Sequence, residues 1–175
     1  METIRKQIYD SRRLFEINSE IVDWDLEPRH GMQKWRGHDK YGFIELTIYE
    51  LQYYKQHINC EFSLNYTSNV DWKVDEDLFP KELYNIHIEE IKIYADFISN
   101  YISALRGKSL DFVFEITFAG FHILDSYRKH TYGRALMEAV ISCFHENYYN
   151  LGKEHKEKYH TLEEIKYRMK KGSMK

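Results

Sequence analysis

The chain has 175 residues and a mass of 21.3 kDa, which suits a single domain. Hydrophobic residues make up 43% of it and Pro occurs only 2 times, which excludes disorder as its overall character. From Leu151 onward, eight basic residues outnumber four acidic ones, so this segment has a charge of +4. Residues 1–150 have a charge of −7, which gives the whole chain a net charge of −3. Because so acidic a body disfavours broad binding to phosphate backbones, any nucleic-acid contact must be local.

Targeting signals for membranes or secretion are missing from the sequence pattern. No stretch approaches the roughly 20 continuous apolar residues of a membrane-spanning helix, and residues 1–10 lack the apolar core of a secretory signal. We therefore expect a cytoplasmic protein with no membrane partner. Cys60 and Cys143 form no CxxC pair, and we do not expect a disulfide between them in that compartment. Cys143 falls on the apolar stripe of a predicted helix and is expected in the core.

Strands are predicted where apolar and polar residues alternate. Residues 1–30 keep no single period and are predicted as strand or mixed structure. Segments 41–49, 61–66 and 110–118 alternate with a period of two, which is typical of strands with one buried face. The strongest case is the last of these, where the apolar positions are Leu110, Phe112, Phe114, Ile116 and Phe118. The three strands can share one sheet with one buried face.

Helices are predicted from apolar residues spaced three and four apart. A long helix should open near Pro80, whose missing N–H suits the first helical position, and stop at Gly107. Its stripe consists of Tyr84, Ile88, Ile91, Ala95, Ile98, Ile102 and Leu105. A second helix should begin after Asp125 and Ser126 as N-cap residues. Residues 1–150 are thus expected to form one α+β domain, and the basic tail 151–175 a short helix or a frayed end.

Four short motifs occur in order along the chain: Glu2-Thr3-Ile4, His30-Gly31-Met32-Gln33 followed by Gly37 and Tyr41-Gly42, Phe79-Pro80-Lys81-Glu82, and Phe121-His122-Ile123-Leu124-Asp125-Ser126. Together they resemble domain IV of elongation factor G, over about residues 1–148. The resemblance implies a single-layer mixed sheet covered on one face by helices, in a split β-α-β arrangement with a left-handed crossover. Such a crossover runs against the strong right-handed preference of these units.

The resemblance also implies two tip loops, residues 30–40 and 119–126, that contact the ribosome or structured RNA. In the first loop only Lys34 and Arg36 remain where the family has several lysines, which puts its phosphate contacts in doubt. The chain has no GxxxxGK[ST] loop, so we expect no nucleotide triphosphate and no cofactor. The RNA-contact candidates are His30, Gln33, Lys34, Trp35, Arg36, His38, Lys40, His122, Asp125 and Ser126.

Each of these candidates also has an ordinary structural interpretation. The first loop mixes basic and aromatic groups, which serve phosphate contact and base stacking on unpaired RNA; it could equally be a solvated loop with Trp35 packed on the body. His122 lies before a helix N-terminus, where anions bind. Asp125 could simply cap that helix, and its charge would compete with a phosphate.

Three functions follow from these observations. The first is a non-catalytic binding module for RNA or the ribosome. The second is a structural or protein-interaction module, such as a homo-oligomer, that has lost the RNA role, which the acidic body and the lost lysines favour. The third, an enzyme using His122 and Asp125 as acid and base, ranks last. A metal site from His145, Glu146, His155 and His160 is disfavoured because the HExxH spacing is missing.

Overall fold

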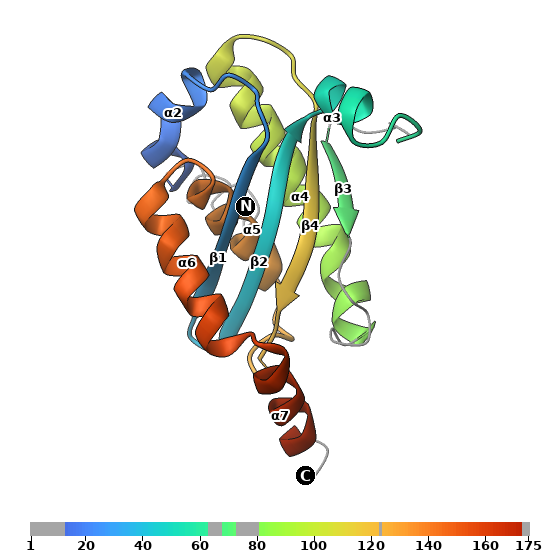
Figure 1. The fold of residues 1–175 in the computed structure, drawn as a ribbon, viewed down its shortest axis with the longest axis vertical. Coiled ribbons are helices and arrows are strands. Elements are labelled where there is room, and N and C mark those ends of the chain that lie inside the picture. The colour runs from blue at the N-terminus through green and yellow to red at the C-terminus, as the bar shows by residue number, and fades with distance from the viewer. Residues whose placement is uncertain (1–12, 63–67, 73–80, 123, 173–175) are drawn as a thin grey trace.

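The computed structural model describes residues 13–62, 68–72, 81–122 and 124–172, which form one sheet surrounded by helices (Figure 1). In chain order the elements are η1 (Phe15–Ile17), α2 (Asn18–Val22), β1 (Arg29–Gly37), β2 (Lys40–Glu50), α3 (Leu51–His57), β3 (Ser68–Trp72), α4 (Lys81–Arg106), β4 (Phe112–Gly120), α5 (Thr131–Ser142), α6 (Glu146–Tyr159) and α7 (Leu162–Gly172). None of the described helices is long and apolar enough to cross a lipid bilayer.

The sheet is mixed, with strand order β1-β2-β4-β3. β1, β2 and β4 pair antiparallel, whereas β3 pairs parallel with β4. The predicted α+β class with a single mixed sheet is therefore confirmed. In Figure 1, β3 and β4 both run downward, β3 lies to the right of β4 and α4 passes behind them, so the β3-α4-β4 connection is left-handed. β3 and β4 are direct neighbours, so no strand splits this unit.

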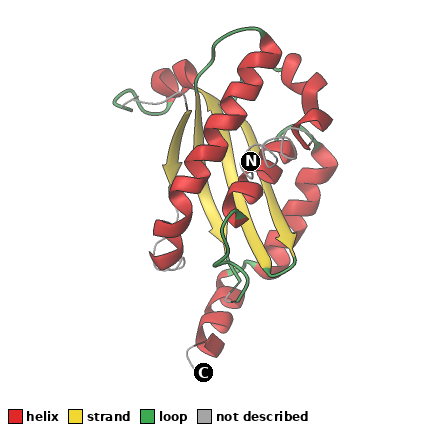
Figure 2. Cartoon of the chain, turned by 180° about the vertical axis from the view of Figure 1, so that it is seen from behind, coloured by secondary structure: helices red, strands yellow, loops and turns green. Residues whose placement is uncertain are grey.

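The main core lies between the sheet and the two helices α4 and α5, which cover the same face (Figure 2). The predicted alternation in β2 is confirmed, since Ile44, Leu46 and Ile48 are fully buried on this side. The long helix also agrees with its predicted stripe: among its described side chains, Ile91, Ala95, Ile98 and Ile102 are fully buried. It ends where predicted, at Gly107, whose φ of 60° is a conformation that favours glycine.

Trp24 closes the core at the end where β1 begins. Its ring stacks on Phe112 at a centroid distance of 5.6 Å and meets Phe144 edge-on at 5.3 Å. Its indole N–H donates to the Glu27 carbonyl at 2.8 Å, which satisfies the one polar atom of a side chain that is 2% exposed. Residues 15–22, predicted as strand or mixed structure, thus form two short helices that pack against the core.

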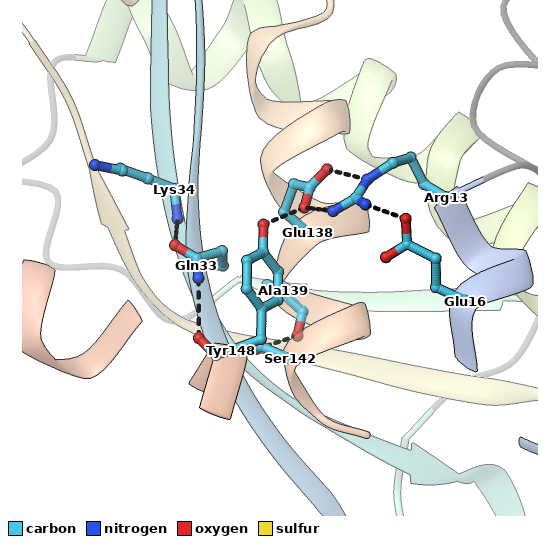
Figure 3. Close-up of polar contacts among 8 residues, drawn as sticks. All are labelled: Arg13, Glu16, Gln33, Lys34, Glu138, Ala139, Ser142 and Tyr148. Carbon is cyan, nitrogen blue, oxygen red and sulfur yellow. Dashed lines mark hydrogen bonds and ion pairs between the residues drawn. The ribbon is translucent and has the colours of Figure 1, made fainter. Parts of the chain in front are cut away.

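A partly buried ion pair fastens this N-terminal segment to α5 (Figure 3). The Arg13 guanidinium donates to both carboxylate oxygens of Glu138, at 3.1 and 2.7 Å, and the Tyr148 hydroxyl donates to the same carboxylate. Glu138 is only 8% exposed. Glu16 contacts the solvent-facing side of the same guanidinium. The Glu138 carboxylate of α5 is therefore bound both by the N-terminal segment, through Arg13, and by α6, through Tyr148.

The other face of the sheet is partly covered as well, by α6, which corrects the expectation that helices cover one face alone (Figures 1 and 2). A second, smaller core lies there, formed by Met32, Tyr41 and Phe43 with Phe118 and Tyr149 packed against them. α6 approaches β1 so closely that a Cβ atom on Gly152 would lie 2.0 Å from the Met32 carbonyl oxygen. The predicted short or frayed tail is thus two helices, the first of them docked on the sheet.

Several predicted boundaries are wrong. Residues 30–37, expected in a loop, form β1, and only His38 and Asp39 make the turn to β2. In the predicted strand 61–66, Glu61 and Phe62 are not in a strand, and residues 63–66 lie outside the described part of the chain; β3 begins at Ser68. Pro80 is also outside the described residues.

Two predictions about side chains near β4 need correction. The second helix begins at Thr131 with His130 before it in a left-handed conformation, so Asp125 and Ser126 do not cap it. The period-two pattern predicts Phe118 on the same face as Phe112 and Phe114. A register shift between β2 and β4 at Glu45 and Leu46 places Phe118 opposite Glu45 instead, on the α6 side.

Candidate functional site

Three separate segments meet at one end of the sheet, shown at the bottom of Figure 1: the β1-β2 turn, the loop 121–130 after β4, and the junction of α6 with α7. Between them lies a cavity of about 220 Å³, called here the tip pocket. Its lining residues are Lys34, Arg36, Tyr41, His122, Asp125, His155 and Tyr159. The pocket therefore combines cationic, aromatic and imidazole side chains with one carboxylate.

The loop 121–130 is fixed to β2 by Ser126. The buried Ser126 hydroxyl donates to the Tyr41 carbonyl at 2.7 Å and accepts from the His122 N–H at 2.7 Å. The Tyr41 N–H in turn donates to the Asp125 carbonyl at 2.9 Å. On the other side, His87 of α4 holds the Ser126 carbonyl at 2.8 Å from its Nε2. Ser126 thus positions His122 and Asp125 and is itself inaccessible to a ligand.

His122 and Asp125 form a pair at the mouth of the pocket. His122 Nδ1 lies 3.3 Å from Asp125 Oδ2, and the two side chains are 40% and 39% exposed. The His122 ring is edge-on to Tyr41 at a centroid distance of 6.3 Å. Both members of the pair can therefore contact solvent or a ligand while the loop holds them in place.

Tyr41 links the pocket to the end of α6. Its hydroxyl oxygen lies 2.6 Å from His155 Nε2 and 2.5 Å from His160 Nε2. Because a phenol carries one proton, it can donate to one imidazole while accepting from the other. The His160 ring is 5% exposed and occupies the space beside Gly120, where a Cβ would lie 2.5 Å from the ring. The absence of a side chain at Gly120 therefore lets the α6-α7 junction reach the sheet.

Four of the ten predicted contact residues line the tip pocket, namely Lys34, Arg36, His122 and Asp125. Lys34 and Arg36 share the α6 side of β1 because they are two apart on a strand. Ser126 lies beneath the pocket as support. The structure thus brings segments 30–40 and 119–126 together at the pocket through these residues. Most of the first segment is strand β1 and not a loop.

The other five candidates lie elsewhere. His30 is near the opposite end of β1, 3.1 Å from the Tyr149 hydroxyl and 3.0 Å from Glu45. Gln33 is buried and donates to the Tyr148 carbonyl. Trp35 lies under the Arg134 guanidinium, 4.9 Å from the ring centroid. His38 is exposed in the turn and Lys40 begins β2. Of these, His38 and Lys40 remain near the tip.

Sequence reasoning missed three residues of the pocket: Tyr41, His155 and Tyr159. His155 and Tyr159 are four apart, a spacing that places them on one face of α6, and their rings lie 4.8 Å apart. That spacing is a usable signal, but only once the segment is known to be helical. Of the residues weighed as metal ligands, His145 caps the start of α6 and His155 lies near its end. Within the described residues, no group of three potential ligands could hold a metal ion.

Glu45 of β2 fastens α6 across the sheet through Lys156, and it also accepts from His30. Burial by itself would raise the pKa of Glu45, but the hydrogen bonds from His30 and Lys156 bring this pKa below its ordinary value of 4.5. A carboxyl whose pKa is lowered by folding stabilises the fold above its unfolded pKa, and this stabilisation is lost as the pH falls through the folded pKa.

Replacing Glu45 with Gln should therefore lower the free energy of unfolding at pH 7 by about 2 kcal/mol. The loss should shrink as the pH falls below 4.5, where the wild-type carboxyl also becomes protonated. Urea unfolding at a series of pH values measures both effects. Glu157→Gln, at an exposed position of α6, is the matched control. Equal losses at both positions, or a loss that grows in acid, would contradict the role of Glu45.

No family model and no curated protein matches this chain. Among solved structures, it is similar to a crystal structure from Thermus thermophilus at 15% identity and a TM-score of 0.35, with 68% of this chain and 15% of that chain covered. The chain thus spans only a small part of that protein, and a likeness at this level carries no argument about function. The resemblance to domain IV of elongation factor G remains a hypothesis supported by the motifs.

Proposed function

We propose that this chain is a non-catalytic binding module that engages RNA, free or within the ribosome, through the tip pocket. The observation that carries the proposal is the convergence of Lys34 and Arg36 from β1 with Tyr41, His155 and Tyr159. Cations that contact phosphates, next to rings on which bases stack, are the combination used to bind unpaired RNA. The motif resemblance to a ribosome-contacting domain supports the same function.

The charge distribution favours an RNA-contact surface that is small and local. The net charge is −3, so a broad electrostatic surface for duplex nucleic acid is not expected. Near the pocket, however, Arg128 and Lys129 are exposed on the loop 121–130, and Lys158 is exposed at the end of α6. A locally positive tip on an acidic body favours contact with a single strand or a projecting loop of RNA.

Replacing both Lys34 and Arg36 with Ala should weaken binding to single-stranded RNA at least about tenfold, because two phosphate contacts are lost. It should also reduce the slope of log affinity against log salt concentration by about one per lost contact. Fluorescence anisotropy with a labelled unstructured RNA measures both quantities, and co-sedimentation extends the test to ribosomes.

Lys108→Ala with Lys153→Ala is the matched control, since it removes the same charge from exposed positions that do not line the pocket. We expect this control to bind almost as well as the wild-type protein. No binding of RNA or ribosomes by the wild-type protein would overturn the proposal and favour the protein-interaction module. Equal loss in the control would show non-specific attraction in place of a site.

A further inference from the structure

The size of the tip pocket limits what it can enclose. Its volume of about 220 Å³ lies below the roughly 300–1,000 Å³ typical of pockets for drug-sized ligands. A helical segment of RNA cannot enter a cavity of this size, whereas a single nucleotide turned out of a strand can place its phosphate there and lay its ribose and base against the lining side chains. The size of the pocket therefore suits one nucleotide of an RNA strand.

Asp125 is the informative residue because it does not suit a site built for phosphate alone. Its carboxylate would repel an anion held by Lys34 and Arg36, yet it lines the same cavity and is 39% exposed. The contact with His122 is made through Oδ2, and a carboxylate offers about four acceptor positions over its two oxygens. A ligand that fits the whole pocket therefore carries hydrogen-bond donors as well as an anion.

A ribonucleotide has both features. Its phosphate matches Lys34 and Arg36, and its base can stack on the ring of Tyr159 or His155. Its ribose hydroxyls are donors that a carboxylate recognises in other nucleotide sites, and the 2′-hydroxyl distinguishes RNA from DNA. Each class of lining residue thus has a counterpart on one ligand.

We infer that the tip pocket binds one unpaired ribonucleotide, with its phosphate at Lys34 and Arg36, its base against Tyr159 and its ribose hydroxyl donating to Asp125. This inference rests on the proposed RNA-binding function and adds the unit that is recognised and the basis for selecting RNA over DNA. His122, fixed by Ser126, keeps the Asp125 carboxylate in position for the ribose.

The test is a titration of the full chain, followed by the imidazole NMR signals of His122 and His155, with three probes: adenosine 5′-monophosphate, its 2′-deoxy form and inorganic phosphate. We expect the ribonucleotide to shift both signals and to bind about tenfold more tightly than the deoxynucleotide, since about 1.4 kcal/mol corresponds to that factor. Phosphate alone should bind more weakly than either nucleotide.

Asp125→Asn should abolish the preference for the ribonucleotide over the deoxynucleotide, and the deoxynucleotide should bind at least as tightly as to the wild-type protein, because the repulsion between the carboxylate and the phosphate is removed. A merely structural role of Asp125 would instead weaken both. Equal binding of the two nucleotides to the wild-type protein, or signals that shift only for residues outside the pocket, would overturn the inference.

The outcomes also separate this inference from the proposed function. RNA binding that depends on Lys34 and Arg36 but shows no preference for ribose would leave the RNA module in place and overturn the ribonucleotide pocket. Selective binding of the ribonucleotide without any binding of RNA or ribosomes would overturn the RNA module and support the pocket as a site for free nucleotides.

Discussion

Replacing Gly152 with Ala should destabilise the protein by about 3 kcal/mol and displace α6 from β1, because overpacking against a rigid neighbour costs about 1–3 kcal/mol or more. The new Cβ would lie 2.0 Å from the Met32 carbonyl oxygen and 2.8 Å from its carbonyl carbon. These are backbone atoms of a paired strand and cannot turn aside. Elsewhere in a helix the same substitution stabilises by up to about 1 kcal/mol, so the expected sign is reversed here.

Urea unfolding measures this loss, and Glu154→Ala, at an exposed position of the same helix, is the control that should change little. RNA binding should fall in the Gly152 variant as well, because His155 and Tyr159 belong to the displaced helix. A more stable Gly152→Ala protein would show that α6 does not dock on β1 as described.

Replacing Glu138 with Ala should lower the free energy of unfolding by about 3 kcal/mol, near the lower end of the roughly 3–5 kcal/mol that breaking a buried ion pair costs. The Arg13 guanidinium would lose both of its hydrogen bonds to Glu138, and the Tyr148 hydroxyl would lose its acceptor (Figure 3). The lower end applies because the Arg13 side chain is 28% exposed and water can replace part of the lost contact.

Glu16→Ala is the control, since it removes the exposed partner of the same arginine and should cost less than about 1 kcal/mol. A double-mutant cycle with Arg13→Ala isolates the coupling between Arg13 and Glu138. A coupling near zero, with a full loss from Glu138→Ala alone, would assign the stabilisation to Tyr148 and to packing.

The regular elements could be predicted where one periodic pattern extended over many residues. β2, β4 and α4 each have a face that packs against the core, so burial follows the period of the backbone. β1 could not be recognised in this way. Its core-facing positions include Gly31, which packs against the Ala139 carbonyl, and the polar but buried Gln33. Because the sequence of β1 lacks alternating apolar residues, its pattern predicts a loop.

The candidate site could be predicted only in part, because its residues come from segments that lie far apart in the sequence. The motifs indicate Lys34, Arg36, His122 and Asp125, but Tyr41 of β2 and two residues of α6 complete the pocket, and the sequence of α6 is mainly polar. α6 docks through the ring of Tyr149, through the small surface of Gly152 and through ion pairs such as that of Lys156 with Glu45. Such contacts leave no hydrophobic stripe in the sequence. For Ser126 the sequence predicts the wrong role. Serine is typical of helix caps, but here its hydroxyl donates to the Tyr41 carbonyl of β2.

The placement of α6 also bears on how the sheet meets other chains. Exposed edge strands offer unpaired backbone groups on which a second chain can add a strand, and proteins limit this hazard by covering, shortening or charging such edges. At β1 the edge is accompanied by α6, with Gly152 against Met32 and Gln33 bonded to the Tyr148 carbonyl. At the other edge, β3 has five residues and includes Asp71, which accepts from Tyr54 at 2.8 Å. Among the described strands, the edge not accompanied by α6 is thus β3, a strand of only five residues.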